Sequence, residues 1–97
     1  SGLVDFLYDR YNHPKAIILF GSFRKGEDIS TSDIDIAIEH DEFKEYKTVN
    51  LKELYEFEKS IKKNIQIHEF NRKNIDINIF NNIANGIVLI GFLEVKL

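Results

Sequence analysis

Residues 16–39 read AIILFGSFRKGEDISTSDIDIAIE, and this stretch decides which fold we expect. It opens with an apolar run from Ala16 to Phe20, which is typical of a central strand covered on both faces. Gly21-Ser22 ends that run, and a polar loop follows. From residue 33 onward apolar and polar side chains alternate, as in a strand with two different faces. Isoleucines form the apolar back, and the acidic front carries Asp33, Asp35, Ala37 and Glu39.

Outside this stretch, the spacing of apolar residues predicts three helices and two further strands. We expect helices over residues 2–12, 48–63 and 74–85, and strands over residues 65–70 and 87–90, while residues 42–47 stay open between helix and loop. Asn50 with Glu53 resembles a capping pair at the start of the second helix. Asn85-Gly86 ends the third, because glycine is the usual C-terminal cap. This order predicts an α+β domain with a mixed sheet of about four strands and helices packed against it.

Length and composition restrict the class of protein. A chain of 97 residues predicts one domain, residues 1–97. Such a small domain has little stability in reserve, so docking to a second copy or to a partner would help it. The absence of cysteine excludes disulfides and thiolate metal sites and fits a reducing cytoplasm. We find no apolar run that spans a bilayer and no signal peptide, so we expect a cytoplasmic protein without membrane contact.

Charge is distributed unevenly along the chain. The net charge is −3, whereas a dedicated nucleic-acid binder usually has a basic domain, so nucleic acid is not expected as a partner. Acidic residues concentrate over residues 27–45, and basic ones over residues 59–73. Solvated surface is the simplest explanation of both. The functional alternative is that the acidic stretch attracts metal ions and the basic stretch meets phosphate or an acidic partner.

Asp33 and Asp35 are candidates for holding a divalent metal ion. Residues i and i+2 of a strand share a face at roughly 6.5 to 7 Å, so their carboxylates can converge on one ion. Mg²⁺ prefers one or two carboxylates together with substrate phosphates and water. A lone Asp-x-Asp pair is more often the solvent face of a strand. However, aspartate is depleted in strands, and two on one face repel each other, which favours the metal hypothesis.

Gly21 and Ser22 are candidates for holding phosphate. Gly21 allows close approach of a ligand to the backbone, Ser22 offers a hydroxyl and an N–H, and Lys25 can reach phosphate oxygens. Taken alone, this segment is also explained as an ordinary turn with a solvated basic pair. A Walker A motif is excluded, because Glu27-Asp28 stand where Lys and Ser or Thr are needed after Gly26.

Together the two elements resemble the motif of polymerase-β-type nucleotidyltransferases. The short length resembles the minimal, MNT-type branch of that superfamily, and the resemblance covers nearly the whole chain, including the closing segment at residues 84–89. It implies a nucleotidyltransferase core in which Mg²⁺ is carried by Asp33 and Asp35, the expected catalytic residues. It also implies that the nucleoside triphosphate is bound by Gly21, Ser22, Lys25 and Ser32.

The third strand departs from the family pattern. Active members carry a third carboxylate there, which helps to place the metal and takes the acceptor's proton, and the matching position in this chain is Gln66. Glutamine is neutral and cannot act as a base, and loss of a positioned base typically costs about 10² to 10⁴ in rate. Two substitutes are conceivable. His68 shares the strand face of Gln66. Glu69 has the right charge but needs a bulge to reach that face.

Two classes of function follow from this resemblance. The first is an Mg²⁺-dependent enzyme that transfers a nucleoside monophosphate, expected to be AMP from ATP, to a hydroxyl. The resemblance implies an antitoxin-like role, with a tyrosine of a HEPN-type toxin partner as the acceptor. The second is a catalytically impaired binding module that neutralises its partner by docking, which the glutamine at position 66 motivates. A nucleic-acid-modifying enzyme is the weakest reading, because it would need a basic, aromatic-lined groove.

Overall fold

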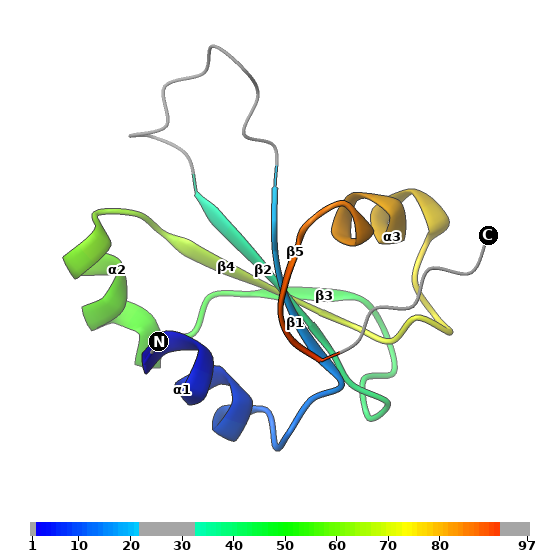
Figure 1. The fold of residues 1–97 in the computed structure, drawn as a ribbon, viewed down its shortest axis with the longest axis horizontal. Coiled ribbons are helices and arrows are strands. Elements are labelled where there is room, and N and C mark those ends of the chain that lie inside the picture. The colour runs from blue at the N-terminus through cyan, green and yellow to red at the C-terminus, as the bar shows by residue number, and fades with distance from the viewer. Residues whose placement is uncertain (1, 22–32, 92–97) are drawn as a thin grey trace, which may run out of the picture.

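The computed structural model describes residues 2–21 and 33–91, which form three α-helices and five strands (Figure 1). The helices are α1 (Gly2–Arg10), α2 (Tyr55–Ile61) and α3 (Ile77–Ala84), and a 3₁₀ turn, η2 (Lys52–Leu54), leads into α2. The strands are β1 (Ala16–Phe20), β2 (Ile34–Glu39), β3 (Lys47–Val49), β4 (Ile65–Phe70) and β5 (Ile87–Gly91). The predicted α+β class is confirmed.

All five strands of the described residues belong to one mixed sheet with the order β3-β4-β2-β1-β5. β2 and β4 run parallel, and the other neighbouring pairs are antiparallel. The chain returns from β2 to β4 through β3, η2 and α2, because parallel neighbours need a long crossover connection. The predicted mixed sheet is therefore confirmed, with β3 as the strand that the sequence did not indicate.

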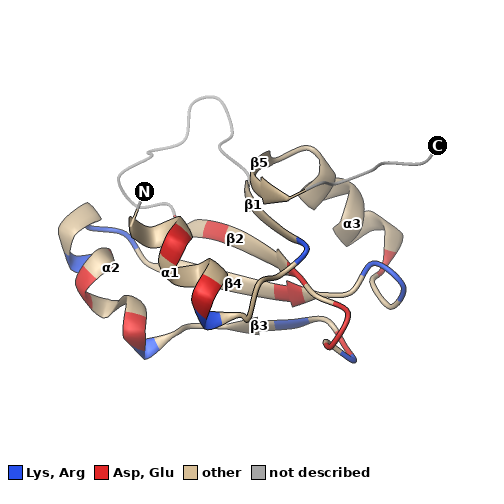
Figure 2. Cartoon of the chain, turned by 60° about the horizontal axis from the view of Figure 1, so that its bottom comes forward, with Lys and Arg blue, Asp and Glu red and all other residues tan. Residues whose placement is uncertain are grey.

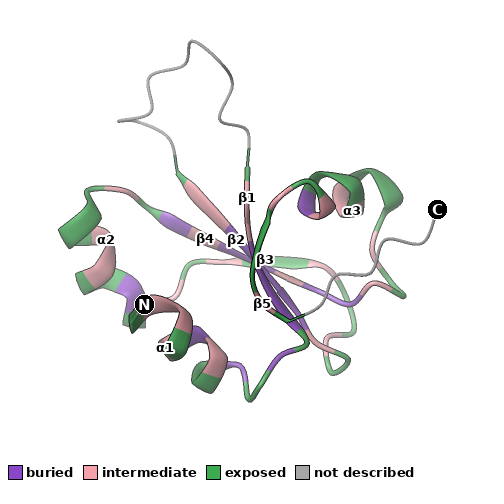
Figure 3. Ribbon diagram, in the orientation of Figure 1, coloured by how far each residue is buried: buried purple, intermediate pink, exposed green. Residues whose placement is uncertain are grey.

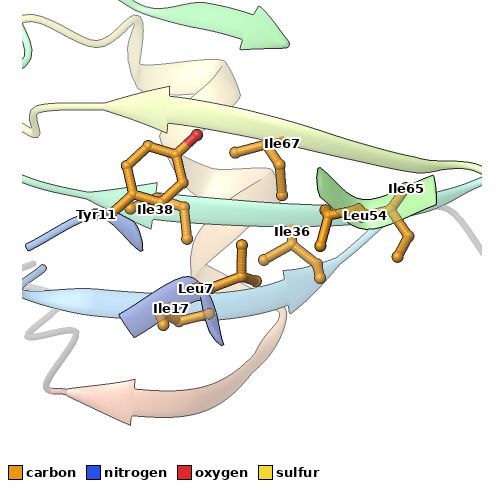
Figure 4. Packing of buried hydrophobic residues seen from close by; sticks show 8 residues of the cluster. All are labelled: Leu7, Tyr11, Ile17, Ile36, Ile38, Leu54, Ile65 and Ile67. Carbon is orange, nitrogen blue, oxygen red and sulfur yellow. The ribbon is translucent and has the colours of Figure 1, made fainter. Parts of the chain in front are cut away.

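Helices α1 and α2 pack on one face of the sheet, which we call the α1–α2 face (Figures 1 and 4). Its core is a cluster of buried side chains drawn from α1, η2 and the inner strands: Leu7, Tyr11, Ile17, Ile36, Ile38, Leu54, Ile65 and Ile67. The predicted apolar back of the second strand is thus confirmed. Alternation along each strand sends these residues to one side, where the helices exclude water from them.

Helix α3 packs on the opposite face, which we call the α3 face. Its apolar cluster is smaller and consists of Ala16, Ile18, Ala37, Phe70 and Ile83. Buried residues concentrate in the first half of β1, in the second half of β2 and along β4, between the two helical layers (Figure 3). These three strands are therefore covered on both faces, as the apolar run of the first strand predicted.

The helix predicted over residues 48–63 is wrong in its first half. Residues 47–49 form β3, which pairs antiparallel with β4, and α2 begins only at Tyr55 after the 3₁₀ turn. Asn50 with Glu53 does not cap it, since the residue before α2 is Leu54 and makes no capping side-chain bond. Of the apolar residues that suggested one long helix, Leu51 and Leu54 lie before α2 and pack on the α1–α2 face together with Phe57 of α2.

The predicted acidic front of the second strand is also only partly correct. Glu39 faces α3 but is 1% exposed, and its carboxylate accepts hydrogen bonds from Arg72 Nε at 2.6 Å and Arg72 Nη2 at 3.0 Å. Ala37 is fully buried on the same face. The acidic surface is thus confined to the start of the strand, because the turn that leads to α3 covers its end.

The turn between α3 and β5 lies where it was predicted, but for a different reason. Asn85 caps α3, with its N–H bonded to the carbonyls of Asn81 and Ile83. Gly86 is needed for space: a Cβ there would lie 2.5 Å from the carbonyl oxygen of Leu19. The glycine therefore lets the end of α3 approach the C-terminal end of β1 closely.

Charged side chains avoid α3 (Figure 2). This helix reads INIFNNIA, whereas α1 and α2 carry both acidic and basic residues.

None of the helices within residues 2–21 and 33–91 has the length and apolar character that crossing a membrane requires.

Candidate functional site

The antiparallel pairing of β1 with β2 brings the glycine turn to the aspartates. Phe20, the last residue of β1, is the register partner of Asp35, and Gly21 follows directly. A Cβ on Gly21 would lie 2.9 Å from Asp35 Oδ2, and its φ of +130° is a conformation that other residues rarely adopt. The fold therefore places a side-chain-free stretch of backbone against a carboxylate oxygen. Any larger residue at position 21 would strain the backbone and crowd that oxygen.

The two aspartates differ in their surroundings. Asp33 is exposed and lies immediately before β2, so it is not part of the strand itself. Asp35 is the second residue of β2, and its side chain is 24% exposed. Both can be reached from solvent at the end of the sheet near Gly21. The other predicted nucleotide-binding residues, Ser22, Lys25 and Ser32, lie outside the described residues.

Asp35 has a histidine partner on the neighbouring strand. Nε2 of His68 lies 2.8 Å from Asp35 Oδ1, and the His68 side chain is 11% exposed. In the β2–β4 register His68 stands opposite Ala37 and Gln66 stands opposite Asp35. The imidazole therefore reaches diagonally across the small side chain of Ala37, a reach that large side chains have between adjacent strands.

A second aromatic group completes this arrangement. The hydroxyl of Tyr46 is hydrogen-bonded to His68 Nδ1, and the ring of Phe20 packs edge to face on the imidazole at a centroid distance of 4.7 Å. Burial raises the pKa of the Tyr46 hydroxyl, and the nearby charge of Asp35 raises it further. Sequence reasoning missed Tyr46, because only the unpredicted pairing of β3 with β4 brings it beside His68.

The candidate positions on β4, Gln66 and Glu69, lie on opposite faces of the sheet. Gln66 lies on the side of Asp35, and its partly buried side chain makes no hydrogen bond within the described part of the chain. Glu69 lies on the α1–α2 face, where its Oε2 accepts a hydrogen bond of 2.8 Å from the Tyr11 hydroxyl. The register of β2 with β4 is regular through Glu69, so no bulge turns it toward Asp35. Of the two conceivable substitutes, only His68 reaches the site.

The donor set around Asp35 fits a magnesium ion that is shared with a phosphate. Within residues 2–21 and 33–91, no group of three or more His, Cys, Asp or Glu side chains comes together as a complete protein site for a metal. Mg²⁺ does not need one, since it is usually held by one or two carboxylates together with phosphates and water. Asp35 Oδ1 is turned to His68, whereas Oδ2 faces the backbone of Gly21. Oδ2 and the exposed Asp33 are therefore the oxygens that suit such an ion.

A pocket of about 220 Å³ adjoins this position. It lies between the end of β1, the last turn of α3 and the start of β5, and its lining includes Phe20, Gly21, Asn82, Asn85 and Ile87. Gly21 thus borders both the pocket and the Asp35 carboxylate. This edge of the α3 face combines a hollow, an exposed turn of backbone and accessible carboxylates.

Comparison with known proteins assigns this chain to a family. The family model described as "Polymerase beta, Nucleotidyltransferase" matches residues 4–92, which include every element of the sheet. Neither the curated proteins nor the solved structures gave a significant match.

Proposed function

The chain belongs to the polymerase beta nucleotidyltransferase family, and on this premise we propose that it transfers a nucleoside monophosphate, AMP from ATP, to a hydroxyl acceptor. The observation that carries the proposal is the contact between Gly21 and Asp35, where a Cβ would lie 2.9 Å from the carboxylate. An exposed backbone turn can approach phosphate, and the adjacent carboxylates suit the metal ion that accompanies it.

Each candidate residue has a role in this proposal. Gly21, Ser22, Lys25 and Ser32 bind the triphosphate, and Asp33 and Asp35 hold Mg²⁺. A bound Mg²⁺ would neutralise charge on the phosphates. The acceptor oxygen forms a bond to the α-phosphorus, the bond to pyrophosphate breaks, and the hydroxyl proton leaves to a carboxylate or to water. Gln66 cannot take that proton. We therefore expect a turnover rate about 10² to 10⁴ times lower than that of a site with a positioned base.

The proposed acceptor is a tyrosine on a HEPN-type protein partner, so that the chain acts as an antitoxin in the cytoplasm. Its resemblance to minimal, MNT-type members supports this role. Exposed apolar residues on β5, Ile87 and Val88, are available to a partner beside the site.

A binding module is the second candidate, and Gln66 is the observation that favours it. In that case the fold retains its docking surface and neutralises the partner without modifying it. Loss of the third carboxylate does not prevent metal or nucleotide binding, because two aspartates and the phosphates still satisfy Mg²⁺. Both candidates therefore predict that the chain binds its partner, and they differ in whether it transfers a nucleotide to that partner.

The experiment that separates them uses the proposed HEPN-type partner. We would incubate both proteins with ATP and Mg²⁺ and measure the intact mass of the partner, expecting one added AMP. The double variant Asp33→Asn and Asp35→Asn should lower the rate by at least about 100-fold, since even residues that only support metal ligands are worth 10- to 100-fold. Asp9→Asn, an exposed change on α1, is the matched control.

The result can contradict either candidate. An unmodified partner that is still neutralised by the double variant would establish docking as the mechanism and overturn the transferase. Added AMP that disappears in the double variant and persists in the Asp9→Asn control would overturn the binding module.

A further inference from the structure

We infer that Tyr46 and His68 form a hydrogen-bonded chain that fixes the orientation of the Asp35 carboxylate and so act as positioning residues for the metal and phosphate. The inference rests on the proposed function only in taking Asp35 as a metal ligand. The chain runs from the Tyr46 hydroxyl to His68 Nδ1 and from His68 Nε2 to Asp35 Oδ1, the second contact measuring 2.8 Å.

The imidazole of His68 is itself held in place by its surroundings. Its ring lies on the α3 face of β4, where the edge-to-face contact with Phe20 restricts it on one side. Opposite it in the register, Ala37 leaves the space that the ring needs to reach Asp35. The residue is 9% exposed, so water competes little for its two ring nitrogens. A ring held in this way can hold another group in turn.

The tyrosine and the carboxylate together decide which ring nitrogen carries the proton. A neutral imidazole has one N–H donor and one acceptor nitrogen, and the bond at one nitrogen sets the state of the other. The ionised Asp35 carboxylate only accepts hydrogen bonds, so the ring nitrogen that faces it must be the donor, and Nδ1 is left to accept from the Tyr46 hydroxyl. Nε2 then carries the hydrogen and donates it to Asp35 Oδ1. Without Tyr46, the imidazole could turn an acceptor nitrogen toward the carboxylate and repel it.

The consequence for Asp35 is a carboxylate with two different oxygens. The terminal torsion of an aspartate is soft, so an unbonded carboxylate would turn freely. Here Oδ1 accepts the His68 N–H, and Oδ2 faces the backbone of Gly21, where the phosphate and metal of the proposed reaction would lie. Gln66, the direct register partner of Asp35, makes no hydrogen bond to it. His68 therefore supports the carboxylate from the position two residues further along the strand.

This arrangement assigns His68 a task that differs from that of the missing third carboxylate. Both of its ring nitrogens are engaged by Asp35 and Tyr46, so it orients Asp35 and has no nitrogen left to hold a metal or take the acceptor's proton. Groups that hydrogen-bond metal-ligating side chains typically contribute 10- to 100-fold in metal affinity, because they fix the orientation and protonation of the ligand. We expect a contribution of that size from the Tyr46–His68 chain.

The first test needs neither metal nor nucleotide. Nitrogen-15 NMR of the His68 ring in the isolated protein at pH 8 reports which nitrogen is protonated. We expect the Nε2–H form in the wild type and a mixture of both forms in Tyr46→Phe, which keeps the aromatic ring and removes only the hydroxyl. Tyr55→Phe is the matched control, because this tyrosine is 60% exposed and belongs to α2, which packs on the opposite face of the sheet. An Nδ1–H form in the wild type would overturn the inference.

The second test measures how tightly the protein binds Mn²⁺ in the presence of α,β-methylene-ATP. The electron paramagnetic resonance signal of free Mn²⁺ gives the unbound fraction. We expect about 10-fold weaker binding in Tyr46→Phe and 10- to 100-fold weaker binding in His68→Leu, with Tyr55→Phe unchanged. His68→Gln should recover part of the loss, since its amide can still donate to Asp35. Wild-type affinity in both Tyr46→Phe and His68→Leu would overturn the positioning role. Absence of Mn²⁺ binding in the wild type would count against the proposed function, while the ring nitrogens would still decide whether the chain orients Asp35.

Discussion

The two faces of the sheet differ in what they bury. On the α1–α2 face, leucine and isoleucine side chains fill the space between helices and strands, and Tyr11 is the residue with a polar tip in that buried cluster. On the α3 face, a smaller apolar cluster shares the surface with Asp35, Glu39 and His68. The first face therefore supplies most of the hydrophobic stabilisation, and the second gives up apolar area to hold polar groups in fixed positions.

The polar groups of the α3 face are tolerated because each has a partner. Asp35 is bonded to His68, and the buried Glu39 is bonded to Arg72. In the described residues no buried side-chain nitrogen or oxygen lacks a hydrogen bond. Burying such groups unpaired would cost more than a domain of this size can lose. Substitutions that remove a buried contact from one face at a time test this contrast.

The largest effect on stability is expected from the α1–α2 face. Ile67→Ala removes a fully buried side chain from that cluster and should lower the free energy of unfolding by about 2 to 5 kcal/mol. This is a large part of the stability of a typical domain, so urea titrations at low temperature are the suitable measurement. Ile77→Ala, at a position 64% exposed, is the matched control and should change stability by less than about 0.5 kcal/mol. Equal losses in the two variants would show that burial in the α1–α2 cluster does not decide the stability of this face.

The next largest effect is expected from the buried ion pair of the α3 face. Arg72→Met leaves the Glu39 carboxylate buried without its donor, which should cost about 2 to 3 kcal/mol, the exposed third of the Arg72 side chain moderating the loss. The double variant Arg72→Met with Glu39→Leu should recover most of that loss, since it removes the charge as well. A urea-based double-mutant cycle measures the coupling. Additive losses would show that the two side chains act independently.

Much of the fold could be predicted from local sequence patterns. The isoleucines at positions 34, 36 and 38 alternate strictly, so the strand and its apolar face were readable. β3 was not, because a strand of three residues has too few positions to show a period and depends on pairing with β4. The length of α2 was overestimated because Leu51 and Leu54 face the core at helical spacing but belong to the segment before the helix.

The part of the candidate site that depends on neighbouring strands could be predicted in the same way, and the part that depends on distant segments could not. Gly21 and Asp35 lie together because two adjacent strands in the sequence pair antiparallel, the commonest arrangement for neighbours. The Tyr46–His68 contact depends on β3 pairing with β4 across 22 residues of sequence, and no local pattern marks it. The burial of Glu39 likewise follows from Arg72, which lies 33 residues away in the chain.

A smaller effect, dependent on pH, is expected from the polar contact of the α1–α2 face. Burial raises the pKa of Tyr11, and its hydrogen bond to Glu69 raises it further. The stabilisation from this tyrosine is complete below the unfolded pKa near 10 and is lost as pH rises toward the higher folded pKa. Tyr11→Phe should therefore cost about 1 kcal/mol at pH 8 and progressively less above pH 10.

Urea titrations of wild type and Tyr11→Phe at pH 8 and at pH 10.5 measure this difference. Tyr55→Phe, which removes the hydroxyl of an exposed tyrosine, is the control at both pH values. A gap between wild type and Tyr11→Phe that stays constant with pH would mean that Tyr11 ionises at the same pH in the folded and unfolded chain.

The smallest effect is expected where the α1–α2 face meets solvent. Arg10 Nε lies 2.8 Å from Glu53 Oε2, and this pair joins α1 to η2 with both side chains more than two-fifths exposed. The hydrogen bond from Arg10 lowers the pKa of Glu53, yet exposed pairs of this kind contribute little because water and salt screen them. Glu53→Gln should leave the midpoint of thermal unfolding unchanged within error in low and high salt. A clear loss in low salt that vanishes in high salt would mean that this surface pair helps to hold α1 on the sheet. An unchanged midpoint beside the large loss in Ile67→Ala would assign the stability of this face to its buried side chains.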